Sequence, residues 1–211
     1  MAYAVKEIFY TLQGEGRNAG RAAVFCRFTG CNLWSGREID RVSAVCRFCD
    51  TDFVGTDGAG GGRFGSGNEL AETIVSMWPS GVGGQRLVVL TGGEPLLQVD
   101  AELLASLHSR DFEIAVETNG TIAVPAGVDW VCVSPKANAT LAVTSGDEMK
   151  LVFPQPNIDP ATFESLAFDH FLISPLDGPL THENTQAAVA YCLQHPRWRL
   201  NLQTHKFLGI R

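Results

Sequence analysis

The sequence lacks long apolar runs, an excess of positive charge and an N-terminal leader pattern. No apolar run approaches the roughly 18 residues that a helix needs to cross a bilayer, so we expect no membrane association. The chain has 16 Lys and Arg against 23 Asp and Glu, a net charge of −7, which argues against a nucleic-acid partner. Residues 1–7 show neither a basic stretch nor the apolar core of a secretory signal, so we expect a cytoplasmic protein.

The rest of the composition is that of an ordinary folded protein. Apolar residues make up 45% and charged residues 18%, which excludes a disordered or collagen-like chain. A length of 211 residues suits one domain, and we expect a single domain over residues 1–211.

The chain has six cysteines, and a disulfide framework is not expected because there is no secretory signal. Another role for the cysteines is therefore expected. Three of them, Cys26, Cys132 and Cys192, stand inside apolar segments and are interpreted as small buried side chains. The other three, Cys31, Cys46 and Cys49, fall in one stretch that has the character of a loop. They are therefore the candidates for metal ligands.

Apolar segments that alternate with helical patterns predict an α/β fold. Strands are expected at 5–9, 22–28, 87–90, 113–117, 130–134, 149–153, 171–174 and 199–203, with helices at 68–78, about 99–109 and 183–194. This order indicates a mostly parallel sheet with right-handed crossovers. A complete eight-unit barrel takes about 250 residues. The shorter chain therefore predicts an incomplete, open (β/α) barrel.

Polar residues follow many of these strands, where α/β folds gather their chemistry. They stand at 13–16, 91–95, 117–120, 134–136, 174–177 and 203–206. A segment with seven glycines, residues 55–67, lacks the Gly-Lys-Ser/Thr ending of a phosphate loop and is interpreted as a mobile surface loop.

The spacing of Cys31, Cys46 and Cys49 leaves two kinds of site open. One is a zinc site completed by Asp50 or a distant His. The other is a [4Fe–4S] cluster held by three thiolates, with one iron left open for a ligand. The aromatic Phe48 and the later Gly-Gly-Glu-Pro turn, 92–95, favour the cluster.

These motifs resemble those of the radical S-adenosylmethionine (SAM) superfamily. Residues 46–49 resemble its C-x-aromatic-C signature and 91–95 resemble its GGE motif. Fourteen residues separate Cys31 from Cys46, where the superfamily usually has three. That long spacing, the opening motif 9–16 and the segments 49–51, 117–120, 134–136 and 203–206 resemble the 7-carboxy-7-deazaguanine synthase family over essentially the whole chain. The resemblance implies an open barrel of the radical SAM type with an enlarged cluster-binding loop.

The resemblance implies a carbon–nitrogen lyase of preQ0 and queuosine biosynthesis. Such an enzyme converts 6-carboxy-5,6,7,8-tetrahydropterin into 7-carboxy-7-deazaguanine with loss of ammonia. Its cofactors are a [4Fe–4S] cluster, S-adenosylmethionine and Mg²⁺, and the first two carry the difficult chemistry. The family also implies a homodimer and an external one-electron donor of the flavodoxin or ferredoxin type. The sequence identifies neither the donor nor the fold of the insert between Cys31 and Cys46.

The resemblance assigns the site residues to four groups. The cluster ligands are Cys31, Cys46 and Cys49, which count as the catalytic residues, and the Mg²⁺ ligand is Thr51. The cofactor-binding residues are Phe48, Asp50, Gly93, Ser134, Lys136, Ser174, Pro175, Leu176 and Asp177. The substrate-binding residues are Leu12, Gln13, Gly14, Arg27, Thr91 and Arg211, and Arg27 suits the substrate carboxylate because a guanidinium binds it bidentately.

Several of these residues also have a purely structural interpretation. Arg27 would then pair with Glu15 or Glu117, and Thr51 would only cap a turn. Glu117 and His205 would form a structural polar pair.

Two rival functions also remain. The first is a radical enzyme with another substrate, such as an activase that places a glycyl radical on a partner protein. The second is a zinc-stabilised binding module without catalysis.

Overall fold

The computed structural model describes residues 2–211 and divides them into strands, α-helices and short 3₁₀ helices. The strands are β1 (Tyr3–Leu12), β2 (Ala22–Phe28), β3 (Gly62–Phe64), β4 (Arg86–Gly92), β5 (Phe112–Thr118), β6 (Trp130–Val133), β7 (Ser145–Phe153), β8 (Ala167–Pro175) and β9 (Trp198–Leu200). The α-helices are α1 (Gly67–Met77), α2 (Ala101–His108), α3 (Thr181–Gln194) and α4 (Thr204–Leu208), and the 3₁₀ helices are η1 (Glu38–Ser43), η2 (Pro95–Leu97) and η3 (Pro160–Phe163). Across residues 2–211, no helix has the length and apolar composition needed to span a membrane.

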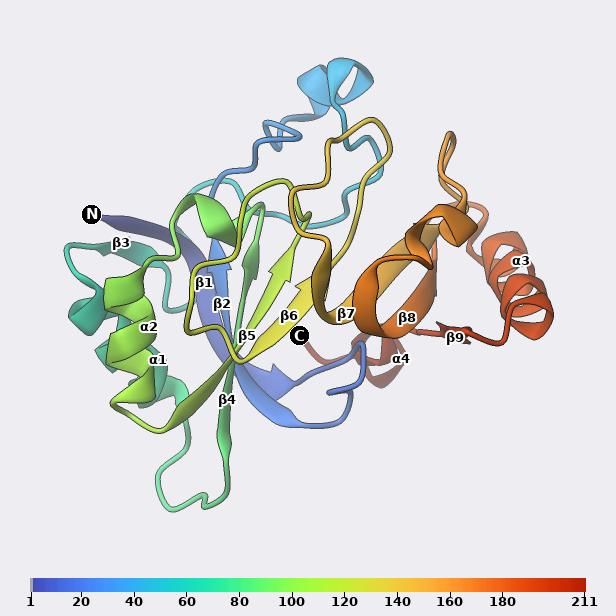
Figure 1. The fold of residues 1–211 in the computed structure, drawn as a ribbon. Coiled ribbons are helices and arrows are strands. Elements are labelled where there is room, and N and C mark those ends of the chain that lie inside the picture. The colour runs from blue at the N-terminus through green and yellow to red at the C-terminus, as the bar shows by residue number, and fades with distance from the viewer. Residues whose placement is uncertain (1) are drawn as a thin grey trace.

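The strands form one open sheet. Their order across the nine-stranded sheet of the described residues is β3-β1-β2-β4-β5-β6-β7-β8-β9 (Figure 1). From β2 to β9 all neighbours are parallel, whereas β1 is antiparallel to both β2 and β3. The outermost strands β3 and β9 are not paired with each other in residues 2–211, so the barrel is incomplete, as predicted.

The direction of β1 corrects one step of the sequence argument. Residues 13–16 were grouped with the carboxyl ends of parallel strands. Leu12 at the end of β1 is paired with Ala22 at the start of β2, so this loop lies at the opposite edge of the sheet (Figure 1). The remaining predicted strand ends share the carboxyl edge because their strands are parallel. Residues 13–16 therefore approach the inner face of the sheet from the other side.

Helices cover the outer face of the sheet. Leu70 of α1 and Leu103 of α2 pack with Val88, Leu90 and Ile114 in one continuous apolar core. A second core lies between α3 and the strands β7 and β8. Each fully buried apolar side chain contributes about 1.5–3 kcal/mol to folding. These outward-facing positions therefore hold the fold together.

Helix α1 begins earlier than the sequence indicated. A helix starting at Asn68 was expected, but the helix starts at Gly67 and its cap is Ser66, whose Oγ accepts the N–H of Glu69 at 3.2 Å. Asn68 lies in the first turn instead, where its side chain donates to Glu72. Serine and asparagine are equally good caps, so the sequence did not distinguish the two positions.

The glycine-rich segment is more ordered than predicted. Residues 62–64 form β3, which pairs antiparallel with the start of β1. Gly58 donates its N–H to the carbonyl of Lys6, and Ile8 donates to the carbonyl of Ala59. A Cβ at Gly61 would lie 2.2 Å from the Lys6 oxygen. The glycines therefore allow the segment to lie directly against β1.

Candidate active site

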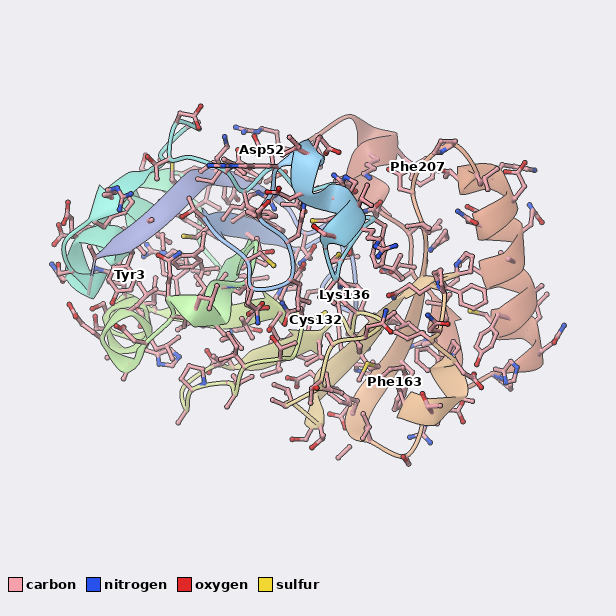
Figure 2. The ribbon with its side chains drawn as sticks, turned by 90° about the horizontal axis from the view of Figure 1, so that it is seen from above. Tyr3, Asp52, Cys132, Lys136, Phe163 and Phe207 are labelled. Carbon is pink, nitrogen blue, oxygen red and sulfur yellow. The ribbon has the colours of Figure 1, made fainter. Side chains whose placement is uncertain are left out.

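A cavity of about 420 Å³ lies over the inner face of the sheet. This volume is typical of a small-molecule site. Cys132 and Lys136 line the cavity. Figure 2, seen from above, shows them near the centre of the molecule, with Tyr3 and Phe207 toward opposite sides. Every residue that the sequence assigned to the cluster, cofactor, substrate or Mg²⁺ lines this cavity: Leu12, Gln13, Gly14, Arg27, Cys31, Cys46, Phe48, Cys49, Asp50, Thr51, Thr91, Gly93, Ser134, Lys136, Ser174, Pro175, Leu176, Asp177 and Arg211.

Strand periodicity explains why the inner face is polar. Successive side chains of a strand point to opposite faces, so one strand can serve both the core and the cavity. On β5, Ile114 and Val116 belong to the outer core, whereas Glu117 lines the cavity. Arg27, Thr91 and Lys150 take the corresponding inward positions on β2, β4 and β7. These strands therefore present charged and hydroxyl groups to the cavity.

The three cysteines of the loop face the same end of the cavity. Cys46 lies within hydrogen-bonding reach of Cys49, and this contact lowers the pKa of Cys49 to about 6. Cys31 accepts the N–H of Leu33 at 3.4 Å, and burial raises the pKa of its thiol. In residues 2–211, no three His, Cys, Asp or Glu side chains have the closed arrangement that a single metal ion requires. The three thiols share one cavity.

The sequence left open how the insert between Cys31 and Cys46 folds. It lies against the segment that carries Cys46 and Cys49. It forms η1, whose Arg41 stacks 4.0 Å above the Trp34 ring. Arg41 also donates to the carbonyls of Arg47 at 2.9 Å and Cys49 at 3.1 Å. The edge of Trp34 meets the ring of buried Phe53. Arg41 thus links the insert to the cysteine motif. Trp34 and Phe53 shield the motif from water.

The Gly-Gly-Glu turn approaches the cysteine loop closely. A Cβ on Gly93 would lie 2.1 Å from the Gly30 carbonyl oxygen and 2.9 Å from Cβ of Cys31. Gly92 has φ +137° and lies against the backbone of Phe28. Only glycine fits such a close backbone contact. The motif therefore sets the distance between β4 and the first cysteine.

The glutamate of this turn has a structural role that the sequence did not assign. Glu94 is fully buried, and its carboxylate accepts hydrogen bonds from the Leu96 N–H, the Thr118 hydroxyl and the Asn119 N–H. Burial raises the pKa of Glu94, although the three bonds favour the ionised form. Asn119 in turn donates to Asn32 of the cysteine loop at 2.9 Å. Glu94 therefore ties the ends of β4 and β5 beneath the cluster loop.

Lys136 lies beside the cysteine motif. Its Nζ donates to the carbonyl and the hydroxyl of Ser134, both at 2.7 Å, and lies 6.0 Å from the centre of the Phe48 ring. Burial lowers the pKa of Lys136. The structure thus brings together three residues that the sequence assigned to one cofactor.

Thr51 lies next to the last cysteine. Its N–H and its hydroxyl both face the Cys49 sulfur. The hydroxyl also borders the cavity, so the position is compatible with a metal ligand. The next residue, Asp52, pairs with Lys6 at 3.0 Å.

Lys206, which was assigned no role from the sequence, contacts two carboxylates that the sequence assigned to cofactor binding, those of Asp50 and Asp177. Lys206 of α4 donates to Asp50 at 2.8 Å and also to Asp177. Lys206 holds the pKa of Asp177 below its usual range. The cysteine loop and the turn after β8 are therefore linked through α4. The motif at 203–206 had been placed at a strand end, but Thr204–Leu208 is a helix.

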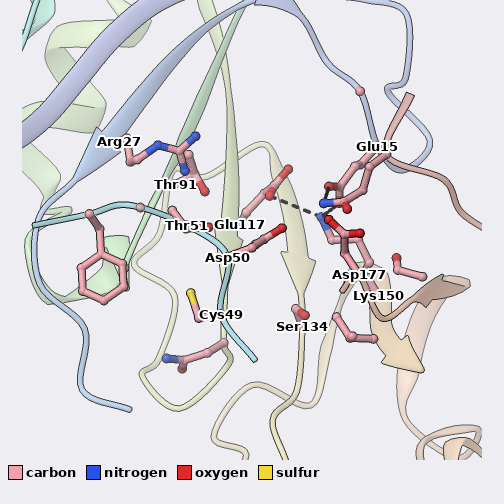
Figure 3. Close-up of a pocket in the computed structure, with 18 of the residues that line it drawn as sticks. Glu15, Arg27, Cys49, Asp50, Thr51, Thr91, Glu117, Ser134, Lys150 and Asp177 are labelled. Carbon is pink, nitrogen blue, oxygen red and sulfur yellow. Dashed lines mark hydrogen bonds and ion pairs between the residues drawn. The ribbon is translucent and has the colours of Figure 1, made fainter. Parts of the chain in front are cut away.

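Arg27 has a different partner from the one the sequence suggested. Its Nε donates to Glu7 at 2.9 Å, and Arg211 contacts the other oxygen of the same carboxylate. The pairing of Arg27 with Glu15 or Glu117 is therefore wrong. The Arg27 guanidinium still faces the cavity (Figure 3). The Arg211 main-chain oxygen accepts the Thr11 hydroxyl at 2.7 Å, which places this residue at the cavity edge.

Glu117 and His205 do not form the polar pair that was the structural alternative. Glu117 accepts from Gln13 at 3.0 Å and pairs with Lys150 at 3.3 Å. His205 lies against Gly14, where a Cβ would come within 2.3 Å of its Nδ1. Both residues line the cavity. Lys150 was passed over because it lies inside an apolar strand, although a charge in such a strand is itself a signal.

Comparisons with known proteins agree with this geometry. A scan against models of protein families gives no match. The chain is 64% identical over 211 residues to the 7-carboxy-7-deazaguanine synthase of Bradyrhizobium diazoefficiens and 63% identical over 210 residues to that of Caulobacter vibrioides, with 100% of each chain covered. It also resembles the crystal structure of QueE from Escherichia coli, at 27% identity and a TM-score of 0.71, over 97% of this chain and 95% of that one.

An open α/β barrel whose carboxyl edge carries three cysteines beside a Gly-Gly-Glu-Pro turn defines a radical S-adenosylmethionine enzyme. Within this class, sequence identity above 60% over the full length of two curated enzymes identifies the family. The chain belongs to the 7-carboxy-7-deazaguanine synthase family, whose members are lyases.

Proposed function

We propose that the chain converts 6-carboxy-5,6,7,8-tetrahydropterin into 7-carboxy-7-deazaguanine and ammonia, in preQ0 and queuosine biosynthesis. The observation that carries this proposal is one cavity in which three thiols, Arg27 and a set of polar inner-face residues converge. The name of the relatives, 7-carboxy-7-deazaguanine synthase, supports the identity of the product. The activase and zinc-module alternatives account for neither the relatives nor the shared cavity.

The thiol side of the cavity fits a [4Fe–4S] cluster. Cys31, Cys46 and Cys49 supply three soft ligands, and glycine at position 93 lets the end of β4 lie directly against the backbone of Gly30, next to Cys31. When bound, the cluster and S-adenosylmethionine supply the radical chemistry that starts the ring contraction. The protein itself contributes orientation and exclusion of water.

The cofactor-side residues would hold S-adenosylmethionine by polar contacts from three elements. Lys136 and Ser134 follow β6, Asp50 follows the last cysteine, and the turn 174–177 ends β8. Phe48 supplies an aromatic face at the same edge. Lys206 fixes Asp50 and Asp177 relative to each other, so these contacts act as one unit.

The substrate-side residues line the same cavity. Arg27 would bind the pterin carboxylate, because its guanidinium faces the cavity and only one edge is taken up by Glu7. Leu12, Gln13 and Gly14 would hold the pterin edge, with Thr91 and the Arg211 main chain at the border. An ordered substrate keeps its reactive carbon away from water, which a radical reaction requires.

Mg²⁺ would bind at Thr51 together with substrate oxygens and water, an incomplete oxygen shell of the kind that Mg²⁺ accepts. In the Thr51→Ala variant we expect turnover to lose most of its response to Mg²⁺, while the iron content stays that of the wild type. The measurement is the initial rate of product formation against Mg²⁺ concentration. A Thr51→Ser variant retains the oxygen and serves as the matched control. An unchanged Mg²⁺ response in Thr51→Ala would remove Thr51 from the site.

The proposal extends to partners and location. The enzyme would work in the cytoplasm as a homodimer and take its electron from a flavodoxin- or ferredoxin-type protein. The family membership supports these points, and a reduced flavodoxin and a reduced ferredoxin can be compared directly as donors.

The deciding experiment measures iron, sulfide and zinc in protein purified and reconstituted without oxygen, followed by a turnover assay with the pterin. We expect about four irons and four sulfides per chain, a brown charge-transfer band, and formation of 7-carboxy-7-deazaguanine. One zinc without sulfide would overturn the proposal. A loaded cluster that cleaves S-adenosylmethionine but leaves the pterin unchanged would overturn the substrate assignment alone.

A further inference from the structure

Lysines are few in this chain, and most of them serve the cavity. There are four, at 6, 136, 150 and 206, and the last three line the cavity. Lys150 differs from the others because it lies in the middle of β7 and only 8% of its side chain is exposed. A lysine in such a position is rarely found without a specific partner.

Two carboxylates meet the Lys150 ammonium. Its Nζ lies 2.6 Å from Oε2 of Glu15 and 3.3 Å from Oε2 of Glu117 (Figure 3). Two amides complete the set, because Gln203 donates to Glu15 and Gln13 donates to Glu117, each at 3.0 Å. The three charged residues come from the loop after β1, from β5 and from β7. The arrangement therefore exists only where these three parts of the sheet meet.

The charges of this set depend on each other. Burial by itself would lower the pKa of Lys150, but Glu117 and Glu15 raise it well above its usual value. Burial would likewise raise the pKa of Glu15, but Lys150 lowers it to about 2. Two carboxylates on one side of a cavity repel each other unless a cation lies between them. Lys150 is the cation that lets these two carboxylates lie close together.

Figure 3 shows Arg27 on one side of the cavity and Glu15 and Lys150 on the other, with Glu117 between them. A pterin carries its carboxylate at one end and a row of N–H donors, on the amino group and the ring, at the other. A guanidinium on one side and two carboxylates on the other match that order of charges. The carboxylates of Glu15 and Glu117 suit the N–H edge, since ionised acceptors form the stronger hydrogen bonds.

We propose that Lys150 is a positioning residue that holds the carboxylates of Glu15 and Glu117 in place as joint acceptors for the N–H edge of the pterin. Lys150 itself stays behind the two carboxylates and does not touch the reacting carbon. This inference rests on the proposed function, because it takes the pterin as the substrate.

Other titratable groups face Lys150 and must be counted in any pH study. Besides Glu15 and Glu117, they are Cys132 on β6, Glu148 on the same strand, Lys136 after β6 and His205 on α4. Burial raises the pKa values of Cys132 and Glu148. Cys132 then stays a thiol near neutral pH. The two carboxylates that contact Lys150 are therefore the groups that its removal changes first.

The experiment compares the holoenzyme with Lys150→Met, Lys150→Arg and, as a matched control, Arg110→Met. Arg110 pairs with Glu72 on the outer face, so its variant also removes an ion-paired cation but leaves the cavity intact. For each protein the KM for the pterin, the KM for S-adenosylmethionine and cleavage of S-adenosylmethionine without pterin are measured. The pterin KM is also followed between about pH 6.5 and pH 8.5.

We expect Lys150→Met to raise the pterin KM about 10- to 100-fold at neutral pH, the size of effect given by an unpaired buried charge. The raised KM should fall as pH rises, because the carboxylate that took up a proton ionises again. The KM for S-adenosylmethionine and its pterin-free cleavage should stay near the wild-type values. Lys150→Arg should restore most of the pterin affinity, and Arg110→Met should behave as the wild type.

A pterin KM that is unchanged, or raised equally at every pH, would overturn the proposal. If Lys150→Met does not fold, the double variant Glu15→Gln with Lys150→Met removes the repulsion and is tested in its place. The double variant should fold and load its cluster but keep a raised pterin KM, and a wild-type KM would refute the inference. No pterin turnover by the wild type would instead reject the proposed function.

Discussion

The outer and inner faces of the one sheet are built from different chemistry. Outward side chains such as Val88 and Ile114 pack against α1 and α2 in a continuous apolar core. Inward side chains on the same or neighbouring strands include Thr91, Glu117 and Lys150, which line the cavity. Stability and chemistry are thus divided between alternate residues of the same strands. The difference teaches that a change on one face should leave the other largely intact.

The largest expected effect comes from the inner face. Cys46→Ala should abolish cleavage of S-adenosylmethionine, because the cluster would lose one of three protein ligands. The measurements are iron and sulfide content and formation of 5′-deoxyadenosine. Cys192→Ala removes a thiol from α3 in the outer layer and should leave both readouts unchanged. A Cys46→Ala protein that still cleaves the cofactor would contradict the ligand assignment.

A change in the outer face should lower the stability of the fold and leave the cluster and the activity intact. Leu103→Ala removes a fully buried side chain between α2 and the sheet and should lower the free energy of unfolding by about 2–5 kcal/mol. The folded fraction should keep its wild-type iron content and turnover. Urea unfolding measures the free energy of unfolding, and iron analysis measures the iron content. Leu193→Ala, at an exposed position of α3, is the control. Loss of cluster without loss of stability would break the division between the faces.

The smallest effect is expected at the edge of the cavity, where the ion pairs of Lys206 with Asp50 and Asp177 are half exposed. Lys206→Met unlinks Asp50 from Asp177 and should raise the KM for S-adenosylmethionine about two- to fivefold. The free energy of unfolding should change by less than about 1 kcal/mol. Steady-state kinetics at constant pterin concentration make the measurement, with Lys206→Arg as control. An unchanged KM would show that this link plays no part in cofactor binding.

The sequence was sufficient for most of the strands and for most of the cavity. Apolar runs such as Leu87–Leu90 identify the strands, and parallel neighbours bring their carboxyl ends together, so Thr91 and Ser134 had to share one edge. Motif resemblance then supplied the roles. What periodicity could not show was the direction of β1, because an antiparallel strand has the same pattern as a parallel one. The position of residues 13–15 in the cavity therefore followed from a partly wrong argument.

Contacts between distant segments also escaped prediction. Lys150 was hidden within an apolar strand, and its pairing with Glu15 spans 135 residues of sequence. Lys206 meets Asp50 across 156 residues through a short helix that no periodicity revealed. Strand β3 was masked by its glycines, which usually indicate a loop. In each case the determining partner comes from tertiary structure rather than from a local pattern.

The sequence separation of the Lys150 contacts also has a consequence for how the enzyme is assembled. Contacts that join distant parts of a chain form late, since closing a long loop costs entropy before any contact repays it. Glu15 must meet Gln203 across 188 residues, whereas Cys46 and Cys49 are neighbours. During folding, we expect Cys46 and Cys49 to come together while the end of the cavity that Glu15 and Gln203 close is still open. We then expect iron and sulfide to load before that end closes, so the two steps are separable in time.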